Sequence, residues 1–102
     1  MPLAAPEAFV TDFSLQPVVP NPSHGAMRVE YSVAHEAAVR LSVVDLQGRE
    51  VEVLAQGTYQ PGRYQVSWDG RANRSGPVPA GMYFIRYTTP EKTLVTRVAI
   101  TR

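Results

Sequence analysis

The chain has 102 residues, of which 44% are hydrophobic, so it can form one domain with a core but not two. Its formal net charge is +1 and its basic residues are spread singly, which gives no electrostatic basis for binding nucleic acid or an anionic membrane. The absence of cysteine excludes a disulfide framework, a thiolate zinc site and a cysteine nucleophile. No apolar run approaches the roughly 20 residues of a membrane-spanning helix.

The N-terminal residues 1–12 are rich in proline, alanine and acidic residues, a composition typical of a linker between domains. We expect this linker to lead from the rest of a longer protein into a domain that spans residues 13–102. The first nine residues, MPLAAPEAF, lack the basic and apolar regions of a signal peptide.

Seven short strands are predicted from the alternation of apolar and polar residues, at a spacing of about ten residues. They are expected at residues 13–18, 27–33, 39–43, 51–53, 64–68, 82–87 and 94–100. The sequence MYFIRY (82–87) is apolar on nearly both faces, which predicts a central strand that is covered on both sides. Seven strands with hairpin connections indicate an all-β fold, an immunoglobulin-like antiparallel β-sandwich without the cysteine–tryptophan–cysteine signature of antibody domains.

The segments between the predicted strands carry turn-forming residues. DLQGRE (45–50) predicts a hairpin turn in which Gly48 takes the position that needs a positive φ. TPEK (89–92) predicts a short hairpin, and DGRANRSG (69–76) predicts a polar loop. AHEAA (34–38) is too short for an independent helix and is expected to link two strands.

The stretch VVPNPSHG (18–25) places two prolines around one asparagine just before an alternating strand. Pro20 and Pro22 cannot donate backbone hydrogen bonds, so the stretch is predicted to be an edge or the crossover from one sheet to the other. We expect the Asn21 side chain to bond to backbone groups that the prolines leave unpaired. Gly25 is expected to free the chain to turn into the next strand.

Four motifs follow one another at matching spacings: PNPS (20–23), VRLSVVDLQGREV (39–51), PAGMYFIRY (79–87) and LVTRVAITR (94–102). Together they resemble the C-terminal sorting domain of the type IX secretion system of Bacteroidetes and their relatives. The loop WDGRANRSG (68–76) also resembles the related immunoglobulin-like domain of flagellar hook-capping proteins. The residues that carry the sorting-domain resemblance are Pro20, Asn21, Pro22, Asp45, Gly48, Gly81, Tyr83, Arg97 and Arg102.

This resemblance implies a non-catalytic module that directs the secretion and cell-surface attachment of a larger protein, such as a hydrolase or an adhesin. The module would pass through the periplasm, and the outer-membrane secretion machinery would then recognise it. A sortase-like protease would cut within residues 1–12, and the cargo would be linked to lipopolysaccharide at the cell surface or released. The recognition surface is expected on the final strands, at Arg97 and Arg102.

Two other functions stay open from the sequence. The first is a carbohydrate-binding module of a modular glycoside hydrolase, with a stacking platform of aromatic side chains. Tyr64 and Trp68 fit equally well as core residues, because they alternate in register with Val66. The second is a structural spacer or self-assembly domain whose sheet edges pair with another chain. The candidate platform residues are Tyr59, Tyr64, Trp68, Tyr83 and Tyr87.

The sequence does not assemble the groups that an enzyme needs. His24 and His35 are the only histidines, and we expect both in exposed loops or at strand ends. Glu50 and Glu52 are expected to share one solvated face at the start of a strand. We therefore predict that the chain has no catalytic residue.

A metal site is not expected either. Asp69 and Asn73 could offer oxygen ligands to calcium, but their spacing does not match the calcium-loop pattern, and turn formation explains both residues. We predict no cofactor, no nucleic-acid partner and no membrane span.

Overall fold

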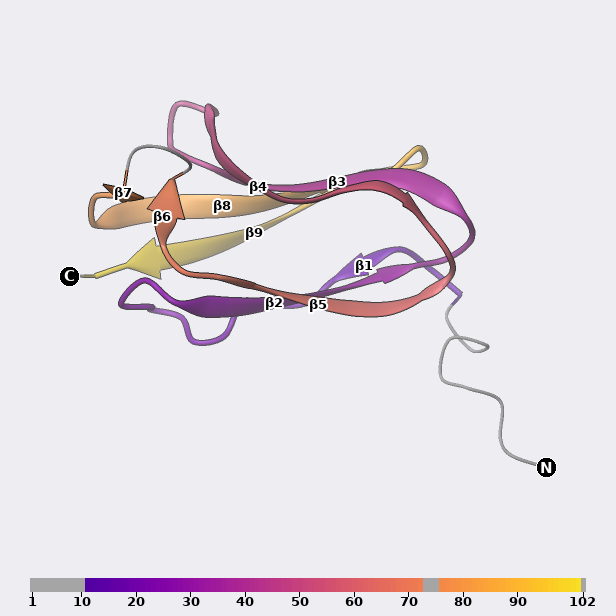
Figure 1. Cartoon of the computed structure of the whole chain (residues 1–102), viewed down its shortest axis with the longest axis horizontal. Helices are drawn as coiled ribbons and strands as arrows, with labels where there is room; N and C mark the ends of the chain where they lie inside the picture. Colours follow the sequence, from indigo (N-terminus) through magenta and orange to yellow (C-terminus); the bar gives the residue numbers. More distant parts are fainter. Residues whose placement is uncertain (1–10, 73–75, 102) are drawn as a thin grey trace.

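The computed structural model describes residues 11–72 and 76–101 (Figure 1). The described residues form nine strands. Within them there is no helix that is long and apolar enough to cross a membrane. The strands are β1 (Ser14–Leu15), β2 (Met27–Val33), β3 (Ala37–Val44), β4 (Glu50–Tyr59), β5 (Gly62–Trp68), β6 (Arg71–Ala72), β7 (Gly76–Pro77), β8 (Gly81–Thr88) and β9 (Thr93–Ile100).

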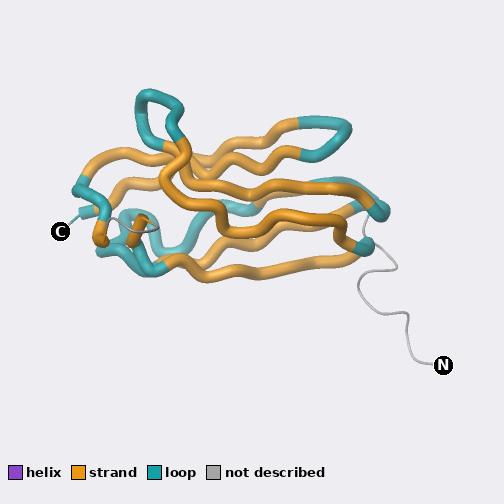
Figure 2. The backbone as a smooth tube through the Cα atoms, turned by 45° about the horizontal axis from the view of Figure 1, so that its top comes forward, coloured by secondary structure: helices purple, strands orange, loops and turns teal. Residues whose placement is uncertain are grey.

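The strands form two stacked sheets, which appear as the lower and upper layers in Figure 1 and as orange segments in Figure 2. A three-stranded sheet has the order β1-β2-β5, and a four-stranded sheet has the order β4-β3-β8-β9. All neighbouring strands are antiparallel. The fourth strand, β4, pairs with the third strand, β3. In antibody constant domains, by contrast, the fourth strand lies in the sheet of the first two strands. The predicted immunoglobulin-like sandwich is therefore confirmed.

Seven of the nine strands overlap the seven that the sequence predicts. The two additional strands, β6 and β7, pair through two residues each, toward the two ends of the segment 69–76 that was predicted to be a loop, and β7 extends one residue beyond it to Pro77. This small difference has a local cause, because two-residue strands are too short to produce a readable alternation.

The core lies between the two sheets and consists of the inward-facing residues of both layers. Along β2, alternate residues point inward, and the same holds along β3, β8 and β9. Full burial of a valine, leucine or isoleucine side chain stabilises a fold by roughly 1.5–3 kcal/mol. The largest fully buried hydrophobic side chains are Tyr87, Phe13, Leu41, Ile85, Ile100, Val29, Val33, Val43 and Val98.

Strand β8 is central in the four-stranded sheet, as predicted, but it is not covered on both sides. Tyr83 and Ile85 face the core and are buried, whereas Phe84 and Arg86 face outward and are partly exposed. No described layer covers this outer face. The prediction of double cover was wrong because Met82 and Phe84 are apolar residues of the outer face that no other described layer buries.

Strand β4 extends to Tyr59, six residues beyond its predicted end at residue 53. Its pairing with β3 shifts register twice, which leaves Val51 and Leu54 as extra residues in two β-bulges. Each bulge resets the alternation of side chains along the strand. The sequence pattern therefore fades after residue 53 although the strand continues.

The bulge at Val51 places Glu50 and Glu52 on opposite faces, which corrects the prediction that they share one. Glu50 lies on the outer face of the four-stranded sheet, where it bonds to Arg40 and Arg86. Glu52 lies opposite Val43, whose side chain is fully buried. One oxygen of the Glu52 carboxylate is buried and has no hydrogen-bond partner.

Candidate functional site

The family-motif residues that the structure describes gather at one end of the sandwich, although they come from four separate segments. Gly81, at the start of β8, pairs with Ile100 at the end of β9, and Ser23 forms a bridge to the same Ile100. The turn at Asp45 and the segment around Gly81 line one hollow of about 590 Å³. This end of the sandwich carries the C-terminus in Figure 1 and lies opposite the N-terminal entry of the chain.

The proline-containing corner at this end switches the chain between the two sheets, as predicted. Val19 forms an antiparallel bridge to Arg28 on β2, in the three-stranded sheet. Four residues later, Ser23 forms a parallel bridge to β9, in the four-stranded sheet. Pro20 and Pro22 lie between the two bridges, and both are preceded by cis peptide bonds.

The Asn21 side chain binds the outer edge of β9. Its Nδ2 donates to the carbonyl oxygen of Arg97 at 3.1 Å, and its Oδ1 accepts from the backbone N–H of Ala99 at 3.1 Å. As predicted, the Asn21 side chain bonds to backbone groups, and the structure places these groups on β9. The sequence separation of more than 75 residues explains why local reasoning missed the partner.

Ser23 continues the contact of the corner with β9. Its backbone N–H donates to the carbonyl of Ala99 at 2.9 Å, and its carbonyl accepts from the N–H of Thr101 at 2.8 Å. The Ser23 side chain is fully buried, donates to the Ala26 carbonyl at 2.8 Å and accepts from the Gly25 N–H at 2.9 Å. The serine thus fixes both the corner and the turn that leads into β2.

Asp45 and Gly48 form the predicted hairpin turn between β3 and β4. The Asp45 Oδ1 accepts from the N–H groups of Arg49 at 3.0 Å and Gln47 at 2.9 Å, and its Oδ2 accepts from Arg49 Nε at 3.0 Å. These bonds, led by the one from the Arg49 backbone, lower the pKa of Asp45 below its usual value. Gly48 has φ +84°, which a residue with a Cβ rarely adopts.

Gly81 and Tyr83 also have structural roles. Gly81 has φ +153° at the first position of β8. Tyr83 is buried, its ring centroid lies 6.5 Å from that of Trp68, and its hydroxyl donates to the Pro79 carbonyl at 2.6 Å. Of the predicted recognition residues, Arg97 points outward from β9 and is exposed. Arg102 lies outside the described residues.

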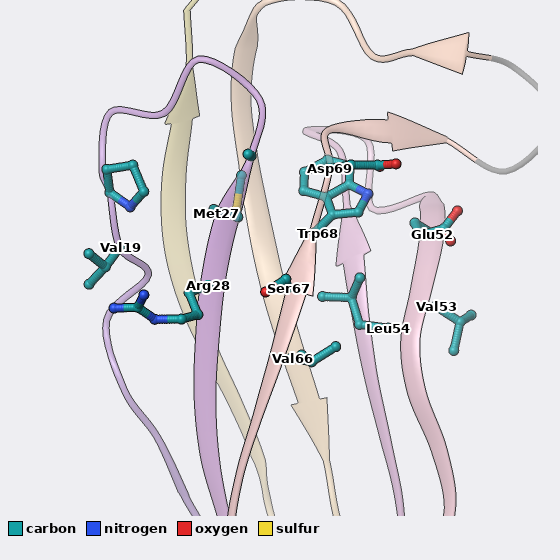
Figure 3. Close-up of a pocket in the computed structure, with 12 residues that line it drawn as sticks. Val19, Met27, Arg28, Glu52, Val53, Leu54, Val66, Ser67, Trp68 and Asp69 are labelled. Atoms are coloured by element: carbon teal, nitrogen blue, oxygen red, sulfur yellow. The ribbon is translucent and has the colours of Figure 1, made fainter.

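A shallow hollow of about 610 Å³ runs beside the corner, from Val19 across β2 and β5 toward β4. Figure 3 shows Arg28 directed toward Val19, while Leu54 is directed from β4 toward β5. The charged groups that line this hollow, such as Arg28 and Glu52, lie on different strands and form no ion pair with each other in the described structure. The hollow has mixed polarity, because valine, leucine and tryptophan line it together with Arg28, Glu52 and Asp69.

The candidate calcium site is only partly described. Asp69 accepts a hydrogen bond through Oδ1 from the Arg71 N–H at 3.0 Å, which is a turn contact. Asn73 lies outside the described residues. Among the residues that the structure describes, no three histidine, aspartate or glutamate side chains lie close enough together to hold a metal ion.

The two histidines lie on the surface and have partners that the sequence did not indicate. His35 pairs with Glu91, 56 residues away, and its ring contacts the Phe13 ring edge-on at 5.2 Å between centroids. The Glu91 carboxylate raises the pKa of His35. The His24 Nδ1 lies 3.0 Å from the Thr101 hydroxyl.

The five candidate platform residues pack in the core or against it. Trp68, Tyr83 and Tyr87 are buried in the core, and Tyr59 and Tyr64 are partly buried. The Trp68 Nε1 donates to the Arg71 carbonyl at 3.0 Å, and the Tyr87 hydroxyl donates to the Ser32 carbonyl at 2.8 Å. Burial raises the pKa of Tyr87 to about 12. These rings stabilise the two-layer packing.

These features define an immunoglobulin-like β-sandwich domain that ends in a clamped terminal strand. The chain belongs to the FlgD Ig-like domain family, whose model matches residues 20–92. It is similar in fold to the crystal structure of dimeric latent PorU from Porphyromonas gingivalis, with a TM-score of 0.67 and 13% sequence identity. That match covers 91% of this chain and 10% of the PorU chain. No curated protein matches the chain.

Proposed function

We propose that the chain is a non-catalytic module that directs the secretion and surface attachment of a larger protein through the type IX secretion system. The observation that carries this proposal is the joining of the first sorting motif to the last. The Asn21 amide of the PNPS motif holds the terminal strand at Arg97 and Ala99. The two motifs thereby form one folded unit that the export machinery recognises as a surface.

The contacts of the other motif residues support the same interpretation. Asp45 fixes a hairpin turn, and Tyr83 packs in the core beneath the same end of the sandwich. The motif residues therefore build a rigid end, whereas Arg97 presents a charge to solvent. The fold match covers 10% of the much longer PorU chain, which supports a role as one module of a larger protein. In this proposal it travels through the periplasm to the cell surface and requires no cofactor.

A fusion experiment tests the proposal. The whole chain is attached to the C-terminus of a periplasm-directed fluorescent reporter in a host with type IX machinery, and in the same host without the outer-membrane translocon. We expect the reporter at the surface of the first host and in the periplasm of the second. Retention in the periplasm of both hosts, or equal surface display in both, would refute the proposal.

A second candidate, a self-assembly module, is favoured by the edge of β4. This strand lies at the edge of its sheet, and residues 55–59 carry no charged side chain and no proline. Such an edge lacks the usual protection against pairing with another strand. Sedimentation velocity over a hundredfold range of concentration distinguishes the two candidates. A shift from monomer to dimer with rising concentration would favour self-assembly if the Gln56→Lys variant, which adds a charge to the edge of β4, stayed monomeric.

A further inference from the structure

The outer face of the four-stranded sheet is open to solvent and carries an excess of positive charge. The pairing register places alternate residues of β3, β4, β8 and β9 on this face. Its charged residues are Arg40, Arg86 and Arg97, opposed by the single carboxylate of Glu50. The face therefore has two more positive than negative groups.

Four residues of this face form a compact group on β8 and β9, which we call the arginine patch: Phe84, Arg86, Val95 and Arg97. Phe84 lies directly opposite Arg97, and Arg86 lies directly opposite Val95. Side chains that are directly opposite on one face of an antiparallel pair have Cβ atoms about 4.5–5.5 Å apart. Apolar and cationic side chains thus alternate in both directions across the patch.

The two apolar members of the patch are accessible to a partner. The exposed fraction of Val95 is 56%, one of the highest among the large hydrophobic residues described, and Phe84 is partly exposed. The stems of the two arginines lie beside these residues. A partner that covered the patch would bury apolar surface and partly desolvate the guanidinium groups.

The charges of the patch are only weakly neutralised within the domain. Glu50 binds Arg40 through two short bonds, at 2.8 and 2.6 Å, but reaches Arg86 only at 3.5 Å. Arg97 forms no ion pair with any residue in the described ranges. Two guanidinium groups on neighbouring strands thus present donors to solvent.

We propose that the arginine patch binds a segment of a protein partner in which carboxylates stand next to apolar or aromatic side chains. The guanidinium group matches a carboxylate through two parallel hydrogen bonds, and the surrounding apolar contacts exclude water from them. A symmetric contact between this patch and the same patch of a second copy is disfavoured, because the two sets of guanidinium groups would repel each other. The inference concerns binding alone and does not depend on export.

Immobilised synthetic polymers provide a defined probe. The Kd of the whole chain is measured for a random copolymer of glutamate and tyrosine and for polyglutamate, at one moderate ionic strength. The charge-changing variant is Arg86→Gln/Arg97→Gln. Its matched control, Arg28→Gln/Arg63→Gln, removes the same charge from the opposite sheet, where both residues are exposed. Val95→Ser is matched with Val19→Ser, because these valines have similar exposed fractions of 56% and 52%.

We expect the chain to bind the copolymer more tightly than polyglutamate. The patch variant should raise the copolymer Kd about tenfold, and Val95→Ser should raise it about threefold, while each control changes it less than about twofold. Thermal unfolding confirms that every variant is folded. The inference is overturned if the two double variants bind equally, if the two valine variants bind equally, or if the chain does not distinguish the copolymer from polyglutamate.

Discussion

The Asn21 side chain stands beside Ala99 in the place that another strand would take. It supplies one acceptor to the Ala99 N–H and one donor to the carbonyl of Arg97, both at 3.1 Å. Ser23 then adds two backbone bonds, to Ala99 and Thr101. The corner therefore covers the free edge of β9 over its last part, and an edge that is covered in this way is protected from pairing with other chains.

Replacing Asn21 by alanine should destabilise the domain by about 1–3 kcal/mol, because two hydrogen bonds of about 0.5–1.5 kcal/mol each are lost. Urea unfolding measures the change. Gln56→Ala is the control, since the Gln56 amide is exposed and makes no side-chain hydrogen bond among those found in the described residues. Equal stability of Asn21→Ala and the wild type would show that the clamp is not formed in solution.

Gly70 and Gly48 provide a matched pair of substitutions, because their φ angles are +82° and +84°. A Cβ at Gly70 would lie 2.7 Å from the Cα of Gly25, whereas one at Gly48 would meet nothing within 4 Å. We expect Gly48→Ala to cost about 1 kcal/mol from the backbone conformation alone. Gly70→Ala should cost about 3 kcal/mol or more, because steric overlap is added. Chemical denaturation of both variants checks this order, and equal losses would contradict the close approach of the two loops.

The sequence predicted the seven main strands because the alternation of buried and exposed residues is a local property. Met27 to Val33 and Leu94 to Ile100 show it clearly, and both segments form strands at or near the predicted residues. The end of β4 was missed because two bulges, at Val51 and Leu54, interrupt the alternation. A bulge depends on the partner strand, so the sequence of one strand does not reveal it.

The candidate site was predicted only in part, for a similar reason. The prolines around Asn21 indicated a switch between sheets, because a proline has no backbone N–H to donate and so cannot lie within a central strand. This property belongs to the residue itself and can be read from the sequence. The partner of the Asn21 amide and the partner of His35 lie more than 50 residues away along the chain. Only the folded topology brings such groups together.

Glu50 should make stability depend on acid pH. Its bonds to Arg40 lower its pKa from 4.5 to about 2. Because the folded pKa is the lower one, this stabilisation is present above about pH 4.5 and is lost as the pH falls toward 2. The carboxylate is a quarter exposed, so solvent screening reduces the contribution to about 1 kcal/mol.

A double-mutant cycle isolates this ion pair. At pH 7, Glu50→Gln and Arg40→Gln should each destabilise the domain, and the double variant should lose less than the sum of the two, because the second substitution finds the pair already broken. Unfolding by urea at pH 7 and at pH 2.5 gives the four free energies at each pH. We expect the coupling to shrink at the lower pH. Additive losses at pH 7 would contradict the proposed origin of the Glu50 pKa.

His35 should titrate above its usual pKa of 6.5, because it bonds to the Glu91 carboxylate. Since the folded pKa is raised, the pair stabilises the domain fully below about pH 6.5, and this contribution is lost as the pH rises through the folded pKa. Proton NMR of the imidazole ring follows the titration directly. Glu91→Gln should return the pKa of His35 toward its ordinary value. Glu36→Gln is the control, since the Glu36 carboxylate makes no ion pair with His35 in the described structure and should leave the titration unchanged. If His35 titrates at the same pH in Glu91→Gln and in the wild type, the link between the β8–β9 hairpin and the start of β3 does not form in solution.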